Sequence, residues 1–95
     1  MERLAAAVKQ VLKAFADYLD PKEAGVRQEL IFDDVNGHYL LKRVGWIGKE
    51  FVYHSVFYLD IIDDKIWIQY NGTDLLIAEE LNHLGIPNSE IVLGL

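Results

Sequence analysis

The chain has 95 residues, no cysteine and a formal net charge of −6, with nine lysines and arginines against fifteen aspartates and glutamates. A chain of this length builds one hydrophobic core, so a single domain over residues 1–95 is expected, and the absence of cysteine excludes disulfides and cysteine-based metal sites. The acidic charge opposes unaided binding to nucleic acid, which depends on clustered cations, and favours approach to a basic partner protein.

The first predicted element is an amphipathic helix from Glu2 to about Asp20. Apolar residues recur there at spacings of three and four, at Leu4, Val8, Val11, Leu12, Phe15, Tyr18 and Leu19. Asp20-Pro21 should end the helix because a residue before proline avoids the α region, and Gly25 adds a loop signal.

Four segments rich in β-branched and aromatic residues then predict an antiparallel meander. They run from Leu30 to Phe32, from His38 to Val44, from Phe51 to Ile61 and from Ile66 to Tyr70. The turns between them are predicted at Asn36-Gly37, at Trp46-Ile47-Gly48-Lys49 and at Asp63-Asp64.

A second helix is predicted from about Asp74 to Leu84. Asn71-Gly72 supplies the turn before it, Thr73 is the expected cap, and Asp74 suits its first turn. Leu75, Ile77, Ala78 and Leu81 should face inward, Gly85 should end the helix, and Ile91-Val92-Leu93 should form one more short extended piece. The predicted class is therefore α+β: an antiparallel sheet of four or more strands, the first helix on one face and the second helix near the carboxyl end.

The third predicted strand is apolar on both of its faces. Simple alternation places Phe51, Tyr53, Phe57 and Leu59 on one side and Val52, Val56 and Tyr58 on the other. A face that no helix covers would leave an exposed apolar patch, which usually marks an interaction surface, so we expect a homo-oligomer or a hetero-complex. The candidate partner-binding residues are Trp46, Tyr53, Phe57, Tyr58 and Trp67.

Residues that often carry chemistry are better explained here by structure. His38, His54 and His83 lack the short regular spacing of a metal-binding pair. Asp60, Asp63 and Asp64 fit a turn better than a metal or nuclease site, and Asn71-Gly72-Thr73 fits a turn better than an anion site. We therefore predict no enzyme activity, no metal and no cofactor.

The chain is also predicted to have no membrane contact. Its longest apolar runs, such as Val56 to Leu59, fall far short of the ~20 residues that a membrane helix needs, and no signal segment opens the chain. A cytoplasmic protein is the expectation.

A set of motifs follows in a fixed order along most of the chain. The strongest are His38-Tyr39-Leu40-Leu41, Val44-Gly45-Trp46, Lys65-Ile66-Trp67-Ile68-Gln69, Gly72-Thr73 and Gly85-Ile86-Pro87. Together these motifs resemble the XisI family, the fdxN element excision controlling factors of cyanobacteria. Similar proteins usually continue past the position of Gly94 with a short tail, and they commonly have glycine or asparagine where this chain has Asp64.

The resemblance implies a regulatory protein that acts with a companion, XisH, and a site-specific recombinase to excise a DNA element during heterocyst differentiation. Because XisH resembles restriction-endonuclease-like nucleases, an antidote that inhibits such a companion is an alternative function. A small ligand-binding domain is a third. These functions come from analogy with the family and not from the pattern of residues.

Overall fold

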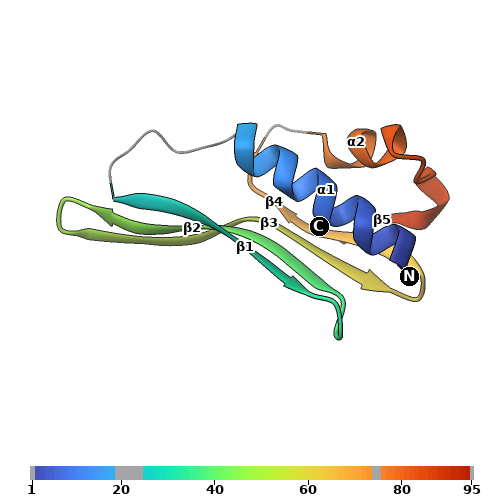
Figure 1. Cartoon of the computed structure of the whole chain (residues 1–95), viewed down its shortest axis with the longest axis horizontal. Helices are drawn as coiled ribbons and strands as arrows, with labels where there is room; N and C mark the ends of the chain where they lie inside the picture. The colour runs from blue at the N-terminus through green and yellow to red at the C-terminus, as the bar shows by residue number, and fades with distance from the viewer. Residues whose placement is uncertain (1, 19–24, 74–75, 95) are drawn as a thin grey trace.

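Five strands form one sheet, and two α-helices pack against a single face of it (Figure 1). This computed structural model describes residues 2–18, 25–73 and 76–94. Its elements are, in chain order, α1 (Glu2–Tyr18), β1 (Val26–Asp33), β2 (His38–Ile47), β3 (Glu50–Ile62), β4 (Lys65–Asn71), α2 (Ile77–His83), a short 3-10 helix (Asn88–Glu90) and β5 (Ile91–Leu93). The predicted α+β class, with the first helix on one face of the sheet, is confirmed.

The sheet order follows the chain, β1-β2-β3-β4-β5. The pairs from β1 to β4 are antiparallel, as the predicted meander requires. The last strand differs, because β5 runs parallel to β4 after the crossover through α2. The carboxyl-terminal extended piece predicted from Ile91 to Leu93 is therefore a strand of the same sheet, which makes the sheet mixed.

The second and third strands are longer than predicted. β2 continues through Trp46 and Ile47, which pair with Phe51 and Glu50 of β3, so the predicted four-residue turn shrinks to Gly48 and Lys49. Aromatic and β-branched side chains favour the strand over the turn. The result is a long hairpin that extends beyond the end of α1 (Figure 1).

The predicted cap of the second helix is wrong. The backbone N–H and the hydroxyl of Thr73 both donate to the side-chain oxygen of Asn71, at 2.9 and 2.8 Å, so they close a local turn. The helix begins at Ile77, and no side-chain hydrogen bond caps it at Leu76. Asp74, which was expected in the first turn, lies outside the described residues.

The predicted end of that helix is confirmed. Gly85 has a positive φ of 90°, which glycine adopts without steric cost. The N–H groups of Gly85 and Ile86 donate to the carbonyl oxygens of Asn82 and Leu81, at 3.0 Å each. Ile86 is buried there.

For α1, the predicted end at Asp20-Pro21 lies outside the described residues. No helix in the described part of the chain is long and apolar enough to cross a membrane.

The hydrophobic core lies between the helices and one face of the sheet. The stripe predicted on α1 supplies Leu4, Val8, Val11, Leu12 and Phe15, and α2 adds Ile77 and Leu81. The sheet supplies Tyr39, Leu41, Val56, Phe57, Leu59, Ile61, Ile66 and Ile68. We call this side of the sheet the helix face.

A β-bulge interrupts the pairing of β2 with β3. Leu41 pairs with Phe57, but the next residue, Lys42, pairs with Ser55, so Val56 is an extra residue in β3. Cross-strand partners share a face, and successive residues of a regular strand alternate between faces. Lys42 and Ser55 therefore lie on the face opposite to that of Leu41 and Phe57.

The bulge overturns the predicted grouping of side chains in β3. Phe57 and Leu59 lie on the helix face, whereas Phe51 and Tyr53 follow Ser55 onto the opposite face. Their exposure agrees with this assignment, because Phe57 and Leu59 are fully buried while Phe51 and Tyr53 are more than half exposed. Simple alternation fails because the extra residue reverses the face on which every later side chain lies.

Candidate functional site

The face of the sheet turned away from α1 and α2 carries many apolar and aromatic side chains. The strand register places on it Ile31, Leu40, Val44, Trp46, Phe51, Tyr53, Tyr58, Trp67, Tyr70 and Val92. Polar residues of the same face include Arg27, Glu29, His38, Lys42, Ser55 and Asp60. In the part of the chain that the structure describes, no helix lies on this side, which we call the uncovered face.

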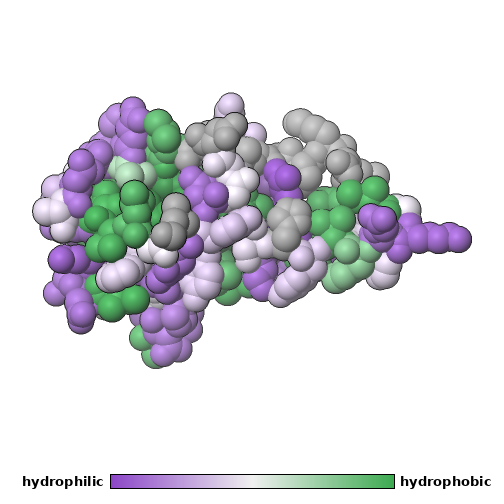
Figure 2. Space-filling view, turned by 180° about the vertical axis from the view of Figure 1, so that it is seen from behind, coloured by the Kyte–Doolittle hydropathy of each residue, from purple (hydrophilic) through white to green (hydrophobic). Residues whose placement is uncertain are grey.

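One end of the uncovered face projects from the molecule. We define the arm as residues 26–29 and 42–55, the parts of β1, β2 and β3 that lie beyond the bulge together with the turn at Gly48-Lys49. The remainder of the chain is called the body. Figure 2 shows hydrophobic side chains gathered at the arm end, on the right of that view.

The arm exposes an aromatic cluster. The ring centroids of Trp46 and Phe51 lie 5.0 Å apart, and those of Phe51 and Tyr53 lie 6.3 Å apart. These three residues are 57%, 54% and 59% exposed. The ammonium group of Lys42 donates a hydrogen bond to the hydroxyl of Tyr53, which ties one edge of the cluster to β2.

Charge is divided unevenly between the arm and the body. The arm contains four cations, Arg27, Lys42, Arg43 and Lys49, against two carboxylates, Glu29 and Glu50, so its net charge is +2. The rest of the chain holds the other five cations and thirteen carboxylates, a net charge of −8. The overall acidity thus belongs to the body, and the aromatic arm is basic.

A polar network interrupts the uncovered face on the body. The carboxylate of Asp60, which is buried, lies 2.6 Å from Nδ1 of His38 and accepts a hydrogen bond of 3.3 Å from the side-chain amide of Gln69. The ring of Tyr58 meets that of His38 edge-on at 6.2 Å. Hydrogen bonding to Asp60 raises the pKa of His38, and burial, with the nearby Asp60, raises the pKa of Tyr58.

This network predicts a pH dependence of stability. The pKa of His38 is higher in the folded chain than its ordinary value of 6.5. The stability that the fold gains from protonated His38 beside Asp60 is therefore fully present below pH 6.5, and it is lost as pH rises through the pKa of the folded chain. We expect the urea midpoint of unfolding to fall as pH rises from 6.5 through the folded-state pKa of His38. The part of this fall that His38 causes should disappear in His38→Gln. His83→Gln, a control in which the Asp60 network is intact, should keep it. A His38→Gln variant with an unchanged pH profile would contradict the assignment.

The candidate partner-binding residues divide between the two faces. Trp46 and Tyr53 lie on the uncovered face in the arm, and Tyr58 and Trp67 lie half-buried on the same face in the body. Phe57 does not belong with them. It is fully buried on the helix face, 5.3 Å from the ring of Phe15, because the bulge separates it from Tyr53.

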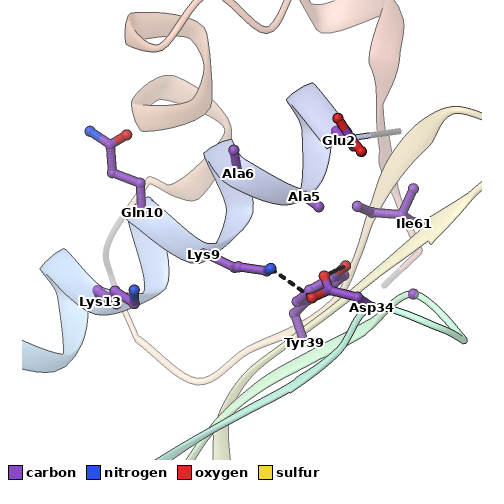
Figure 3. Close-up of a pocket in the computed structure, with 10 residues that line it drawn as sticks. Glu2, Ala5, Ala6, Lys9, Gln10, Lys13, Asp34, Tyr39 and Ile61 are labelled. Carbon is purple, nitrogen blue, oxygen red and sulfur yellow. Dashed lines mark hydrogen bonds and ion pairs between the residues drawn. The ribbon is translucent and has the colours of Figure 1, made fainter.

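A groove of about 760 Å³ lies between α1 and the β1–β2 turn (Figure 3). At its centre Asp34 accepts hydrogen bonds from Lys9, at 2.7 Å, and from the hydroxyl of Tyr39, at 2.8 Å. The bonds from Lys9 and Tyr39 lower the pKa of Asp34, while burial, reinforced by Asp34, raises the pKa of Tyr39 to about 12. Because these groups satisfy one another, the network ties α1 to the turn and presents no concentrated charge to a ligand.

The remaining chemical candidates stay dispersed. No group of three histidine, aspartate or glutamate side chains within the described residues is placed to hold a metal ion. Asp63 and Asp64 form the β3–β4 turn with positive φ angles of 52° and 60°, whereas Asp60 is engaged with His38 on the uncovered face. His83 lies 3.8 Å from Glu80 on α2, and the side chain of His54 lies outside the described part.

Comparison with known proteins adds a family and two close structural relatives. The model of the family described as XisI protein matches residues 1–95. A XisI-like protein from Anabaena variabilis, known from its crystal structure, has 41% sequence identity to this chain. The two structures superpose with a TM-score of 0.89, and the match covers 96% of this chain and 83% of that one. A crystal structure of the fdxN element excision controlling factor XisI from the same species is 33% identical, with a TM-score of 0.81 and coverage of 98% and 89%. None of the curated proteins matches.

Proposed function

The chain belongs to the XisI family, and from this premise we propose that it is a non-enzymatic accessory factor that controls excision of a DNA element by site-specific recombination. It acts by binding a XisH-like partner protein, and its effect on the recombinase is indirect. A relative that matches nearly the whole of this chain is an fdxN element excision controlling factor, which supports the role in excision control.

The proposal that the chain acts by binding a partner protein rests on its acidic body. A protein that cuts or rejoins DNA presents cations to the phosphate backbone, because phosphate neutralisation supplies most of its affinity. A body of net charge −8 is complementary to such a surface and speeds encounter with it. The same charge opposes direct binding of the body to DNA.

A reporter assay tests this proposal. We expect excision of the element to require this chain in cells that also contain the recombinase and the XisH-like protein. The double variant Glu79→Lys with Glu80→Lys reverses the charge at two exposed positions of α2. It should lower excision several-fold because it replaces negative charge that would attract a basic partner.

Glu29→Lys with Glu50→Lys, which reverses the charge of both carboxylates of the arm, changes the total charge by the same +4 and is the control. It should retain excision if the body makes the contact. Excision that proceeds equally well without this chain would contradict the proposal, and so would cutting or recombination of DNA by the purified chain alone.

The acidic body also favours a second candidate, an antidote that covers the DNA-binding surface of a companion XisH-like nuclease. The two functions separate in a growth assay. Only an antidote rescues cells in which the companion alone is toxic, whereas an accessory factor changes excision without affecting survival.

A further inference from the structure

We propose that the uncovered face binds a second copy of this chain, in a twofold dimer in which the arm of each copy lies over the body of the other. A twofold axis that lies between the two sheets, parallel to their planes and perpendicular to the strands near the bulge, generates this arrangement. Because the contact is isologous, it closes at two copies. The inference does not depend on the proposed function, since a dimer can form whether or not the protein controls excision.

The first argument is the amount of apolar surface on this face. Aromatic residues present about 150–250 Å² each, so Trp46, Phe51 and Tyr53, each more than half exposed, contribute roughly 300 Å². Ile31 and Tyr70 are 38% and 47% exposed on the same face of the body.

A standard interface buries about 800 Å² on each partner. The exposed aromatic residues supply part of that area at the arm end of the face, and Ile31 and Tyr70 continue it over the middle, in the row next to the bulge. Ile62, which is 42% exposed, carries it to the body end. The polar side chains between them, among them Lys42 and Ser55, complete the contact. A second sheet packed on this one would shield the whole face, in the manner of a two-sheet sandwich.

The second argument is the division of charge, which decides the orientation. On the uncovered face itself the arm carries Arg27, Lys42 and Glu29, a net charge of +1, and the body carries Asp33, Asp60 and Lys65, a net charge of −1 with His38 neutral. Two arms or two bodies placed against each other would therefore bring like charges together. Only the arrangement of arm on body sets opposite charges against each other at both ends. A molecule with a basic arm and an acidic body is therefore electrostatically complementary to a second copy of itself, despite its overall charge of −6.

The third argument is the position of the aromatic cluster. Phe51 and Tyr53 belong to the part of β3 beyond the bulge, where β3 pairs with β2 alone among the described strands. The helices cover the body and not the tip of this hairpin (Figure 1). An extended arm of this kind gains little for the fold of its own chain from large exposed rings, but it reaches the sheet of a neighbouring copy.

Light scattering coupled to size-exclusion chromatography tests the dimer with a matched set of variants. Trp46→Asp changes the arm, Tyr70→Asp changes the uncovered face on the body side of the bulge, and Val35→Asp is the control. Val35 is 92% exposed in the β1–β2 turn. All three variants add the same charge, so any difference among them reports on position.

We expect the wild-type chain and Val35→Asp to have twice the chain mass of 10.9 kDa in the micromolar range. Trp46→Asp and Tyr70→Asp should each raise the dissociation constant about tenfold or more, with circular dichroism unchanged. A wild-type monomer, a larger oligomer, or a dimer that loses affinity in Trp46→Asp but not in Tyr70→Asp would overturn the arrangement. Val35→Asp acting as strongly as the other two would overturn it as well.

Discussion

Replacing Phe57 with alanine is expected to lower the free energy of unfolding by about 3–5 kcal/mol, the usual cost of removing a buried phenylalanine. The side chain is fully buried at the centre of the helix face, where its ring packs against Phe15 of α1. The loss combines the transfer of the ring to water with the cavity left between α1 and the sheet. Urea unfolding measures it, and midpoint and slope together give the change in stability.

Tyr53→Ala is the matched control for that experiment. Tyr53 belongs to the same strand, but it is 59% exposed on the uncovered face. Its removal should cost a monomer less than about 1 kcal/mol, since substitutions at the surface rarely cost more. Equal losses in the two variants, measured where both are monomeric, would contradict the assignment of these residues to opposite faces.

Replacing Gly45 with alanine is expected to disturb the arm and to lower the free energy of unfolding by about 1–3 kcal/mol or more. A Cβ atom there would lie 1.9 Å from the carbonyl oxygen of Gly25 and 2.7 Å from Cα of Val26. Both contacts are with backbone, so β1 must move away from β2. The same Gly25 carbonyl accepts a 2.9 Å hydrogen bond from the N–H of Trp46, which that movement would break.

Hydrogen exchange locates this effect. The amide groups of β1 and β2 in the arm should lose protection in Gly45→Ala, while those of β4 should retain it at matched stability. Gly48→Asn is the control, because a Cβ at Gly48 meets no atom within 4 Å and asparagine tolerates its φ of 61°. Unchanged protection of the arm in Gly45→Ala would contradict the close packing of β1 against this position.

Local patterns predicted the order and type of the elements because each signal acts over a few neighbouring residues. The helical stripe from Leu4 to Phe15 and the turn at Asp63-Asp64 are of this kind. The parallel pairing of β5 depends on how α2 packs, which no short segment encodes. Thr73 does not cap the helix as predicted, because the hydroxyl and the N–H of Thr73 both donate to the nearby side-chain oxygen of Asn71.

The candidate site was only partly predictable for the same physical reason. Trp46 and Tyr53 are conspicuous as large aromatic residues, and the structure exposes both. The bulge at Val56 arises from pairing between two strands and leaves no mark within one of them, so Phe57 was grouped with the wrong face. The division of charge between arm and body is visible in the sequence only after the arm has been defined by the strand register.

Binding to a XisH-like protein is the central claim, and mixing the two purified proteins tests it most directly. Light scattering coupled to size-exclusion chromatography should reveal a stoichiometric complex that weakens as salt rises, because an acidic body then meets a basic surface. Glu79→Lys with Glu80→Lys should weaken that complex more than Glu29→Lys with Glu50→Lys, which changes the total charge by the same amount. If the two proteins elute separately at low salt throughout the micromolar range, the chain does not act by binding such a partner.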